Sequence, residues 1–210
     1  MTDGVWWFFL FWAPAYFSEL GYPSSSGMGQ ALIFVLYLIV TLLSISGGYL
    51  PKLFVEKMGM NPYAGRMRAM LIFAFLPIFA MFAQPLAEVS PWWPCVIIGL
   101  AGAGHQAWSA NLYSTIGDMF PKSAIATITG IGTIVGLGTM AGGIGSMSIN
   151  FGSGKFFDWA AALGSAFTFF GFEGKPAAYM VVFCICAVAY LIGWCIMKTL
   201  VPKYKPIVVE

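Results

Sequence analysis

The chain has 210 residues, of which 60% are hydrophobic and 9% charged, and its formal net charge is +2. Soluble domains average roughly 25% charged residues, so there are too few charges here to cover a water-soluble globule. The apolar residues also occur in long runs rather than in one-sided stripes, which indicates an all-α integral membrane protein. No basic patch is interleaved with aromatic residues, so nucleic acid is not an expected partner.

Six apolar runs come close to the length of about 20 residues that a spanning helix needs. Residues with turn chemistry separate them, for example at 59–62 and 90–91. The predicted spans cover residues 5–20, 30–50, 67–86, 92–117, 124–149 and 177–197. Residues 1–210 are therefore expected to form a single six-helix unit in the lipid bilayer.

The first run is the shortest and is rich in aromatic residues. It contains Pro14, whose effect on the helix backbone can be compensated by neighbouring helices. Its aromatic residues either anchor the chain at the membrane interface or stack on a sugar ring. Trp12 and Tyr16 are the candidates for the second role.

The fourth run carries the main polar cluster, His105, Gln106, Trp108, Ser109 and Asn111, which includes the chain's only histidine. Polar groups in hydrocarbon cost free energy unless they find partners, so the cluster is expected to face the bundle interior or a water-filled cavity. On a helical wheel His105, Gln106, Ser109 and Tyr113 share one arc, and small residues at 103, 107, 110 and 114 form a packing ridge roughly opposite. Two interpretations remain open. Either His105 and Asn111 make hydrogen bonds between helices, or the cluster lines a solute path.

The fifth run is crowded with glycine, including the close-packing pairs Gly132 with Gly136 and Gly138 with Gly142. These indicate either a helix that slides against a neighbour or a static tight interface. Residues 150–176 are then expected to form a long external loop, acting as an interfacial lid or a passive linker. The third and sixth runs offer almost nothing polar, so we expect lipid-facing outer helices.

The basic residues set the predicted orientation. With alternate loops on opposite sides, eight of the ten basic residues fall on one side, and Lys155 and Lys175 fall on the other. The positive-inside rule then places both termini in the cytoplasm, in the plasma (bacterial inner) membrane. The four cysteines lie inside apolar runs, and Cys184 with Cys186 is not a zinc spacing, so no metal or other cofactor is expected.

Three segments resemble the anion:cation symporters of the major facilitator superfamily, and hexuronate transporters most of all: residues 6–17, 105–111 and 118–122. That family has twelve helices in two six-helix halves, and the chain is similar to the second half. The resemblance implies an N-terminal six-helix half as partner. It also implies that the first and fourth spans line a central cavity, the second and fifth rock against the other half, and the third and sixth face lipid.

Two departures from the family pattern affect the expected site. The loop after residue 50 reads Pro51-Lys52-Leu53, so the usual gate carboxylate is absent. Some hexuronate-type members have a lysine after the first-span proline, where this chain has Ala15.

The expected function is symport of a sugar acid, a hexuronate or hexonate, coupled to H⁺ or Na⁺ by alternating access. Gln106, Ser109 and Asn111 would hydrogen-bond the sugar hydroxyls, Trp108 or Trp12 would stack on the ring, and Tyr16 would orient it. A neutral imidazole is the form that low dielectric favours, so coupling is expected mostly in the other half rather than at His105. The alternatives are a non-transporting membrane subunit that pairs with a separate half and an integral-membrane enzyme with His105 as general base. The second lacks any nucleophile or metal cluster near that histidine in the sequence.

Overall fold

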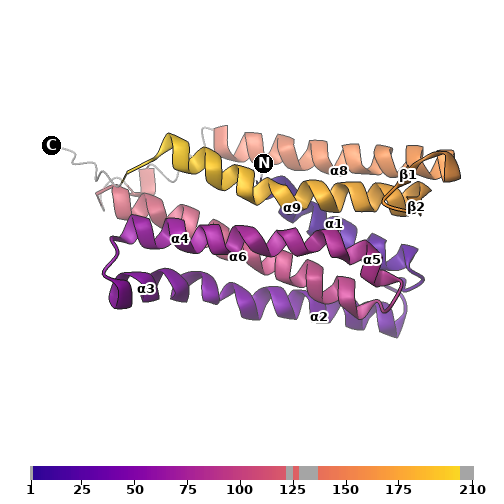
Figure 1. Ribbon diagram of the computed structural model, residues 1–210, viewed down its shortest axis with the longest axis horizontal. Coiled ribbons are helices and arrows are strands. Elements are labelled where there is room, and N and C mark those ends of the chain that lie inside the picture. The colour runs from indigo at the N-terminus through magenta and orange to yellow at the C-terminus, as the bar shows by residue number, and fades with distance from the viewer. Residues whose placement is uncertain (1, 122–124, 128–136, 204–210) are drawn as a thin grey trace.

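The computed structural model describes residues 2–121, 125–127 and 137–203, and it shows a bundle of long helices lying side by side (Figure 1). The helices and strands are α1 (Thr2–Glu19), α2 (Gly27–Ser44), α3 (Ser46–Met58), α4 (Pro62–Phe75), the 3₁₀ helix η1 (Leu76–Phe82), α5 (Ala83–Ala87), α6 (Trp92–Met119), α8 (Leu137–Leu163), the 3₁₀ helix η2 (Gly164–Ala166), β1 (Thr168–Phe169), β2 (Phe172–Glu173) and α9 (Gly174–Leu200). The prediction of a mostly helical chain is confirmed.

Within the described residues, three helical segments are long and apolar enough to cross a membrane. They are Gly27–Met58, which joins α2 to α3, Pro62–Ala87, which joins α4, η1 and α5, and α9. The other long helices α1, α6 and α8 are less apolar. Helix α1 contains tryptophan and tyrosine, α6 carries the polar cluster, and α8 contains several glycines. These residues lower the mean hydropathy of helices whose length is close to or above that of a membrane span.

Local signals in the sequence explain where several helices begin and end. Ser26 caps α2 by accepting a hydrogen bond from the Gly29 amide, and Asn61 caps α4 by accepting one from Ala64, with Pro62 in the first turn. Helix α3 ends at Gly59, whose φ of 63° is the left-handed conformation that glycine adopts without steric cost.

Helix α6 is the central element, and it packs against α2, α3, α4, η1 and α5. Of its 28 residues, 14 are buried. Glycines permit this contact: a Cβ on Gly102 would lie 2.9 Å from Val40 of α2, and one on Gly104 would lie 2.9 Å from Leu76 of η1. The small residues Ala103 and Ala107 are also buried, as the predicted packing ridge requires, whereas Ala110 is exposed.

The structure corrects two predictions. Helix α8 continues to Leu163, so residues 150–163 are helical and the expected loop of residues 150–176 is wrong. Gly152 and Gly154 lower helix propensity there, but burial of Phe157 and Ala160 outweighs that cost. Gly138 and Gly142 lie within α8, whereas Gly132 and Gly136 lie outside the described residues.

The second correction concerns α9. The sixth run was expected to face lipid, but Phe183 and Cys186 are buried, and Tyr190 is fully buried. The opposite side of α9 exposes Ile185, Val188 and Ile192. An apolar run in a membrane carries no sequence signal that separates a protein-facing side from a lipid-facing one, because both sides favour the same residues.

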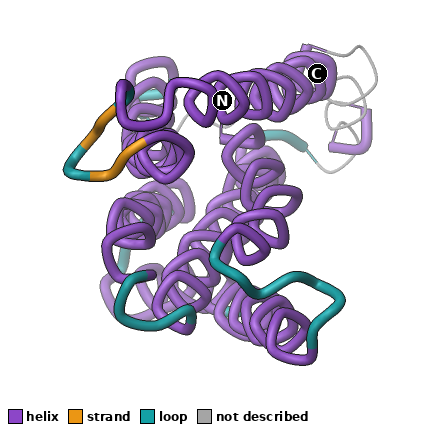
Figure 2. Tube along the Cα trace, turned by 90° about the vertical axis from the view of Figure 1, so that its right-hand side faces the viewer, coloured by secondary structure: helices purple, strands orange, loops and turns teal. Residues whose placement is uncertain are grey.

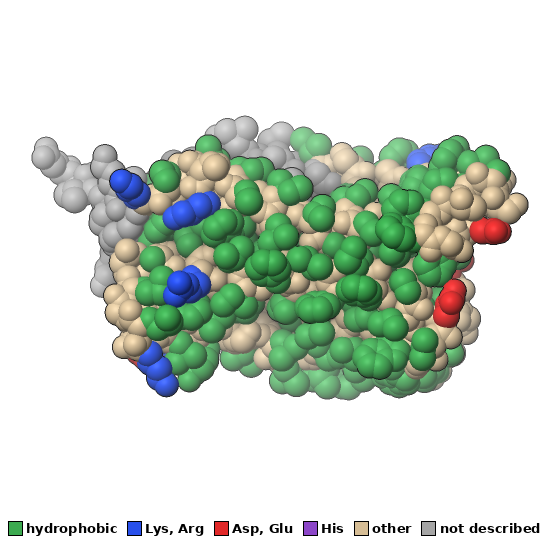
Figure 3. All heavy atoms as spheres, viewed as in Figure 1, with side chains coloured by type: hydrophobic (Ala, Val, Ile, Leu, Met, Phe, Trp, Pro, Cys, Tyr) green, Lys and Arg blue, Asp and Glu red, His purple; other side chains and the backbone are tan. Residues whose placement is uncertain are grey.

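Charged side chains gather at the two ends of the bundle (Figure 3). One end collects the basic residues of the α3–α4 connection and of the end of α9: Lys52, Lys57, Arg66, Arg68, Lys198 and Lys203. The other end collects Glu19, Glu88 and Glu173 together with Lys175, which pairs with Glu19. Two further basic residues of the first group, Lys122 and Lys205, lie outside the described residues.

Candidate functional site

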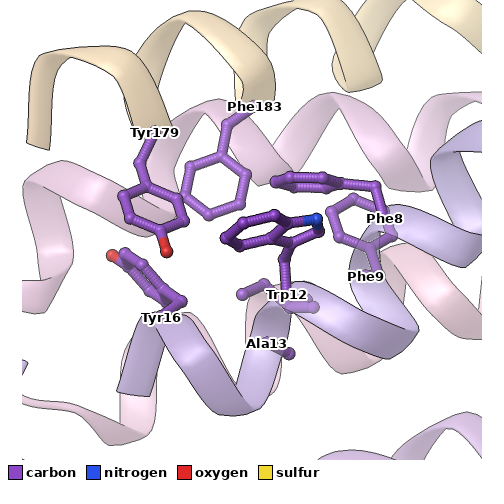
Figure 4. Close-up of a pocket in the computed structure, with 8 residues that line it drawn as sticks. Phe8, Phe9, Trp12, Ala13, Tyr16, Tyr179 and Phe183 are labelled. Carbon is purple, nitrogen blue, oxygen red and sulfur yellow. The ribbon is translucent and has the colours of Figure 1, made fainter. Parts of the chain in front are cut away.

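An aromatic crevice lies between α1 and α9 (Figure 4), and α6 contributes one residue to its lining. It has an empty volume of about 160 Å³ and is too narrow to hold a water molecule. Its lining residues are Phe8, Phe9, Trp12, Ala13 and Tyr16 from α1, Ile98 from α6, and Tyr179 and Phe183 from α9. The crevice therefore contains two of the predicted site residues, Trp12 and Tyr16.

The rings of this crevice hold one another in place. Phe157 of α8 stacks on Tyr179 with centroids 4.1 Å apart and meets Trp12 edge-on at 4.9 Å. Tyr16 lies 4.9 Å from the Tyr179 ring, and its hydroxyl donates to the carbonyl of Ala83 at 3.4 Å. The Tyr179 hydroxyl is buried and has no hydrogen-bond partner among the described residues. The crevice is thus a tightly packed set of aromatic rings, with one phenol hydroxyl that has no partner among the described residues.

His105 connects three helices. Its Nδ1 lies 2.6 Å from the hydroxyl of Tyr190 on α9, and that hydroxyl donates to the carbonyl of Thr2 on α1 at 3.0 Å. A hydroxyl has one proton to give, so the tautomer that satisfies both bonds carries its proton on Nδ1 and donates to Tyr190. Trp6 stacks in parallel on the imidazole at 5.2 Å, and His105 is only 4% exposed. These contacts match the interhelical role that the sequence left open.

Asn111 connects α6 to α3. Its Nδ2 donates to the carbonyl of Gly47 at 2.7 Å and to Ala107 at 2.8 Å. The Gly47 carbonyl needs an outside donor, because the residue four positions later is Pro51, which has no N–H. The Oδ1 atom of Asn111 is buried and unpartnered within the described part of the chain. The amide nitrogen of Asn111 therefore donates both of its hydrogen bonds to backbone carbonyls.

Gln106 and Ser109 differ from these two residues. Both are half-buried, and neither makes a hydrogen bond within residues 2–121, 125–127 and 137–203. Both lie on the side of α6 that also exposes Ala110 and Tyr113. In the predicted cluster, these two side chains keep their polar atoms available to a ligand.

Trp108 is 3% exposed, and its ring meets Tyr190 edge-on at 5.9 Å. Its position in the core leaves Trp12 as the predicted stacking residue that borders a crevice. Tyr179 and Tyr190 were not predicted as site residues; they lie 11 residues apart, about three helical turns, on the same face of α9. Tyrosines inside an otherwise apolar run were the available signal, because a buried hydroxyl needs a partner.

A second cavity of about 270 Å³ opens at the basic end of the bundle. Its lining residues are Gly48, Pro51, Lys52, Val55, Glu56, Pro62, Arg66 and Asp118. Arg66 at the start of α4 forms a two-point ion pair with Asp118 at the end of α6, through Nε to Oδ2 and through Nη2 to Oδ1 at 3.2 Å. This end of the bundle therefore carries a carboxylate from α6, although residues 51–53 contain none.

No group of three or more histidine, cysteine or acidic residues in the described ranges is arranged to hold a metal ion. Comparison with protein-family models, with curated proteins and with solved structures gives no match for the chain.

Proposed function

We propose that the chain crosses the membrane six times, as the carboxy-terminal half of a twelve-helix carrier of the major facilitator type. Three of its helical segments are apolar enough to span, and the less apolar α1, α6 and α8 have 18, 28 and 27 residues. A span needs about 20 residues, so each of these helices comes close to or exceeds that length. The resemblance at residues 6–17, 105–111 and 118–122 supports the assignment to this type of carrier.

The orientation follows from the charge distribution. Six basic residues gather at the bundle end where α3, α6 and α9 terminate, and the positive-inside rule makes this end cytoplasmic. Both termini then lie in the cytoplasm, in a plasma (bacterial inner) membrane. The acidic end, with Glu19, Glu88 and Glu173, faces the outside.

The substrate is an organic anion of the sugar-acid class. The single observation that carries this is the pair Gln106 and Ser109, whose polar groups have no partner among the described residues, on a helix where His105 and Asn111 are both bonded. An amide and a hydroxyl on one face suit the hydroxyl groups of a sugar. Trp12 and Tyr16 on the adjoining α1 line the narrow aromatic crevice, so stacking on the sugar ring requires this crevice to open.

Transport proceeds by alternating access and is coupled to H⁺ or Na⁺. The substrate carboxylate and the coupling ion belong to the other half, because the imidazole of His105 is engaged by Tyr190 and Trp6. On this proposal the chain is not an enzyme, since the same contacts leave His105 no access to a reacting group.

The test is uptake by proteoliposomes that contain the chain with the membrane partner that co-purifies with it. We expect an inward proton or sodium gradient to drive accumulation of radiolabelled galacturonate. Gln106→Ala and Ser109→Ala should raise KM several-fold, whereas Ser44→Ala is the matched control, because Ser44 is also half-buried and bonds only within its own helix. Uptake that ignores the gradient, or equal KM values for all three variants, refutes the proposal.

The same preparation separates this function from its alternative. A stoichiometric six-span partner without uptake of any sugar acid indicates a non-transporting membrane subunit.

A further inference from the structure

The connection between α8 and α9 is a two-stranded hairpin with a bulky residue in a strained turn. Strands β1 and β2 pair antiparallel, with Phe169 opposite Phe172, and Phe170 and Gly171 form the turn between them. Both turn residues have positive φ, 50° for Phe170 and 83° for Gly171. Tight hairpin turns of this kind favour asparagine, aspartate or glycine at both positions, because a side chain there is crowded. Phe170 is the single non-glycine residue with positive φ in the described part of the chain.

The strained side chain is also exposed. Phe170 is 72% exposed, the highest value among the phenylalanines of the described chain. Figure 2, which views the bundle from the end that carries the hairpin, shows the strands projecting sideways beyond the outline of the neighbouring helices. The tip therefore points away from the bundle axis, toward the space that surrounds a membrane protein.

The base of the hairpin is rigid and aromatic. Phe167 meets Phe156 edge-on at 5.7 Å and Trp159 at 5.2 Å, and the amide of Gly174 donates to the Phe167 carbonyl at 2.8 Å. Phe170 in turn contacts Phe169 edge-on at 4.8 Å. The packing of α8 and α9 thus holds the turn and its exposed ring in one place.

We propose that this hairpin is an interfacial anchor, and that the Phe170 ring inserts into the boundary between headgroups and acyl chains beside the first turn of α9. The hairpin leads directly into α9, a candidate membrane span. It therefore lies at the depth in the membrane where a span ends. Trp159, 51% exposed, and Leu163 add apolar surface at the same end, as aromatic belts do. An exposed phenylalanine in a strained turn has no favourable contact in water, whereas in lipid its apolar ring is removed from water, which is favourable.

The charges near the hairpin favour a zwitterionic interface over an anionic one. The charged residues of α1, α8, β2 and α9 nearest the hairpin are acidic Glu19, Asp158 and Glu173 and basic Lys155 and Lys175, a net charge of −1. Lys175 is already paired with Glu19. The anchor is thus apolar rather than electrostatic, and it is independent of what the chain transports.

The test measures the depth of the tip in phosphatidylcholine vesicles. The full chain, with Cys184→Ala and Cys195→Ala to remove the accessible thiols, carries a single environment-sensitive label at Phe170→Cys, or at Thr168→Cys as the matched control on the same hairpin. We expect the label at 170 to be quenched by lipids brominated near the headgroup and shielded from iodide, and the label at 168 to behave oppositely. A label at 170 that iodide quenches as strongly as the one at 168 overturns the proposal. Shielding without lipid quenching also overturns it, because it means that protein covers the tip.

A second variant separates anchoring from folding. Phe170→Asn places a residue that tolerates positive φ in the turn, so we expect the thermal midpoint in detergent to stay constant or to rise. In vesicles, the same variant should expose the hairpin to external proteinase K several-fold faster than the unmodified chain. If Phe170→Asn lowers the midpoint in detergent, Phe170 is a folding residue and the proposal is wrong.

Discussion

The hydroxyl of Tyr37 on α2 donates a 2.9 Å hydrogen bond to the carbonyl of Leu10 on α1. Leu10 lies four residues before Pro14, so its carbonyl has lost the amide that an uninterrupted helix would supply. Asn111 does the same for the carbonyl of Gly47, four residues before Pro51. Each helix-interior proline of α1 and α3 is thus compensated by a side chain from a neighbouring helix, as we predicted from the sequence for Pro14.

Asn111→Ala should destabilise the chain through the Gly47 carbonyl. The substitution leaves that carbonyl without a donor inside the bundle, at a cost of about 1–3 kcal/mol in the free energy of unfolding. Pro51→Ala restores the intrahelical amide, so Asn111→Ala should cost much less in that background. Unfolding in detergent micelles, followed by circular dichroism, measures the two costs. Equal costs in both backgrounds would show that the proline and the asparagine are not coupled.

Tyr37→Phe should have a smaller effect of the same kind. It removes one half-buried bond between α1 and α2, and interhelical hydrogen bonds in membranes contribute about 0.6–2 kcal/mol. Tyr49→Phe is the matched control, because Tyr49 is 60% exposed. The difference between the two thermal midpoints measures the Leu10 bond, and identical midpoints would contradict this account.

Gly47→Ala should separate α3 from α6. A Cβ at this position would lie 2.6 Å from the Cα of Ala107, and backbone cannot yield as a flexible side chain does. Overpacking of this kind costs about 1–3 kcal/mol. The adjacent Gly48 has no atom within 4 Å of such a Cβ, so Gly48→Ala provides a control with the same chemical change. Denaturant titrations of the two variants should differ, and a neutral Gly47→Ala would contradict the packing at this contact.

His105→Gln should preserve ion-coupled uptake in the assembled carrier while it lowers stability. The bond to Tyr190 and the stacking on Trp6 are then weakened, and α1, α6 and α9 lose a shared contact. As a single substitution, Tyr190→Phe should also destabilise the chain. When it is combined with His105→Gln, the two losses of stability should not add, because both substitutions remove the same bond. Proton-coupled uptake that disappears while exchange persists would identify His105 as a coupling residue and refute this assignment.

The candidate site was predictable in its residue types but not in their roles. A histidine, two amides, a serine and aromatic residues within apolar runs could be recognised as unusual from the sequence, and the packing ridge at Ala103 and Ala107 followed from helical spacing. Which of them bond to protein could not be predicted. His105 finds its partner 85 residues away at Tyr190, and Asn111 finds its partner 64 residues away at Gly47.

Some helix ends could likewise be predicted from local sequence, and one could not. Ser26, Asn61 and Gly59 mark their ends through local chemistry, and the structure agrees with them. The end of α8 lacks such a marker. Glycines at 152 and 154 suggested a loop, whereas contacts of Phe157 with Tyr179 and Trp12 keep this stretch helical.

The amino-acid sequence by itself determined that this chain is a bundle of long apolar helices with most of its basic residues at one end, because composition and periodicity act locally along the chain. Only the tertiary structure decided that His105 and Asn111 form hydrogen bonds with neighbouring helices while Gln106 and Ser109 form none among the described residues. It also decided that Phe170 is exposed at the hairpin tip. Hydrogen-bond partners and exposed faces depend on which helices become neighbours, and in a nearly uniform apolar sequence no local pattern encodes that choice.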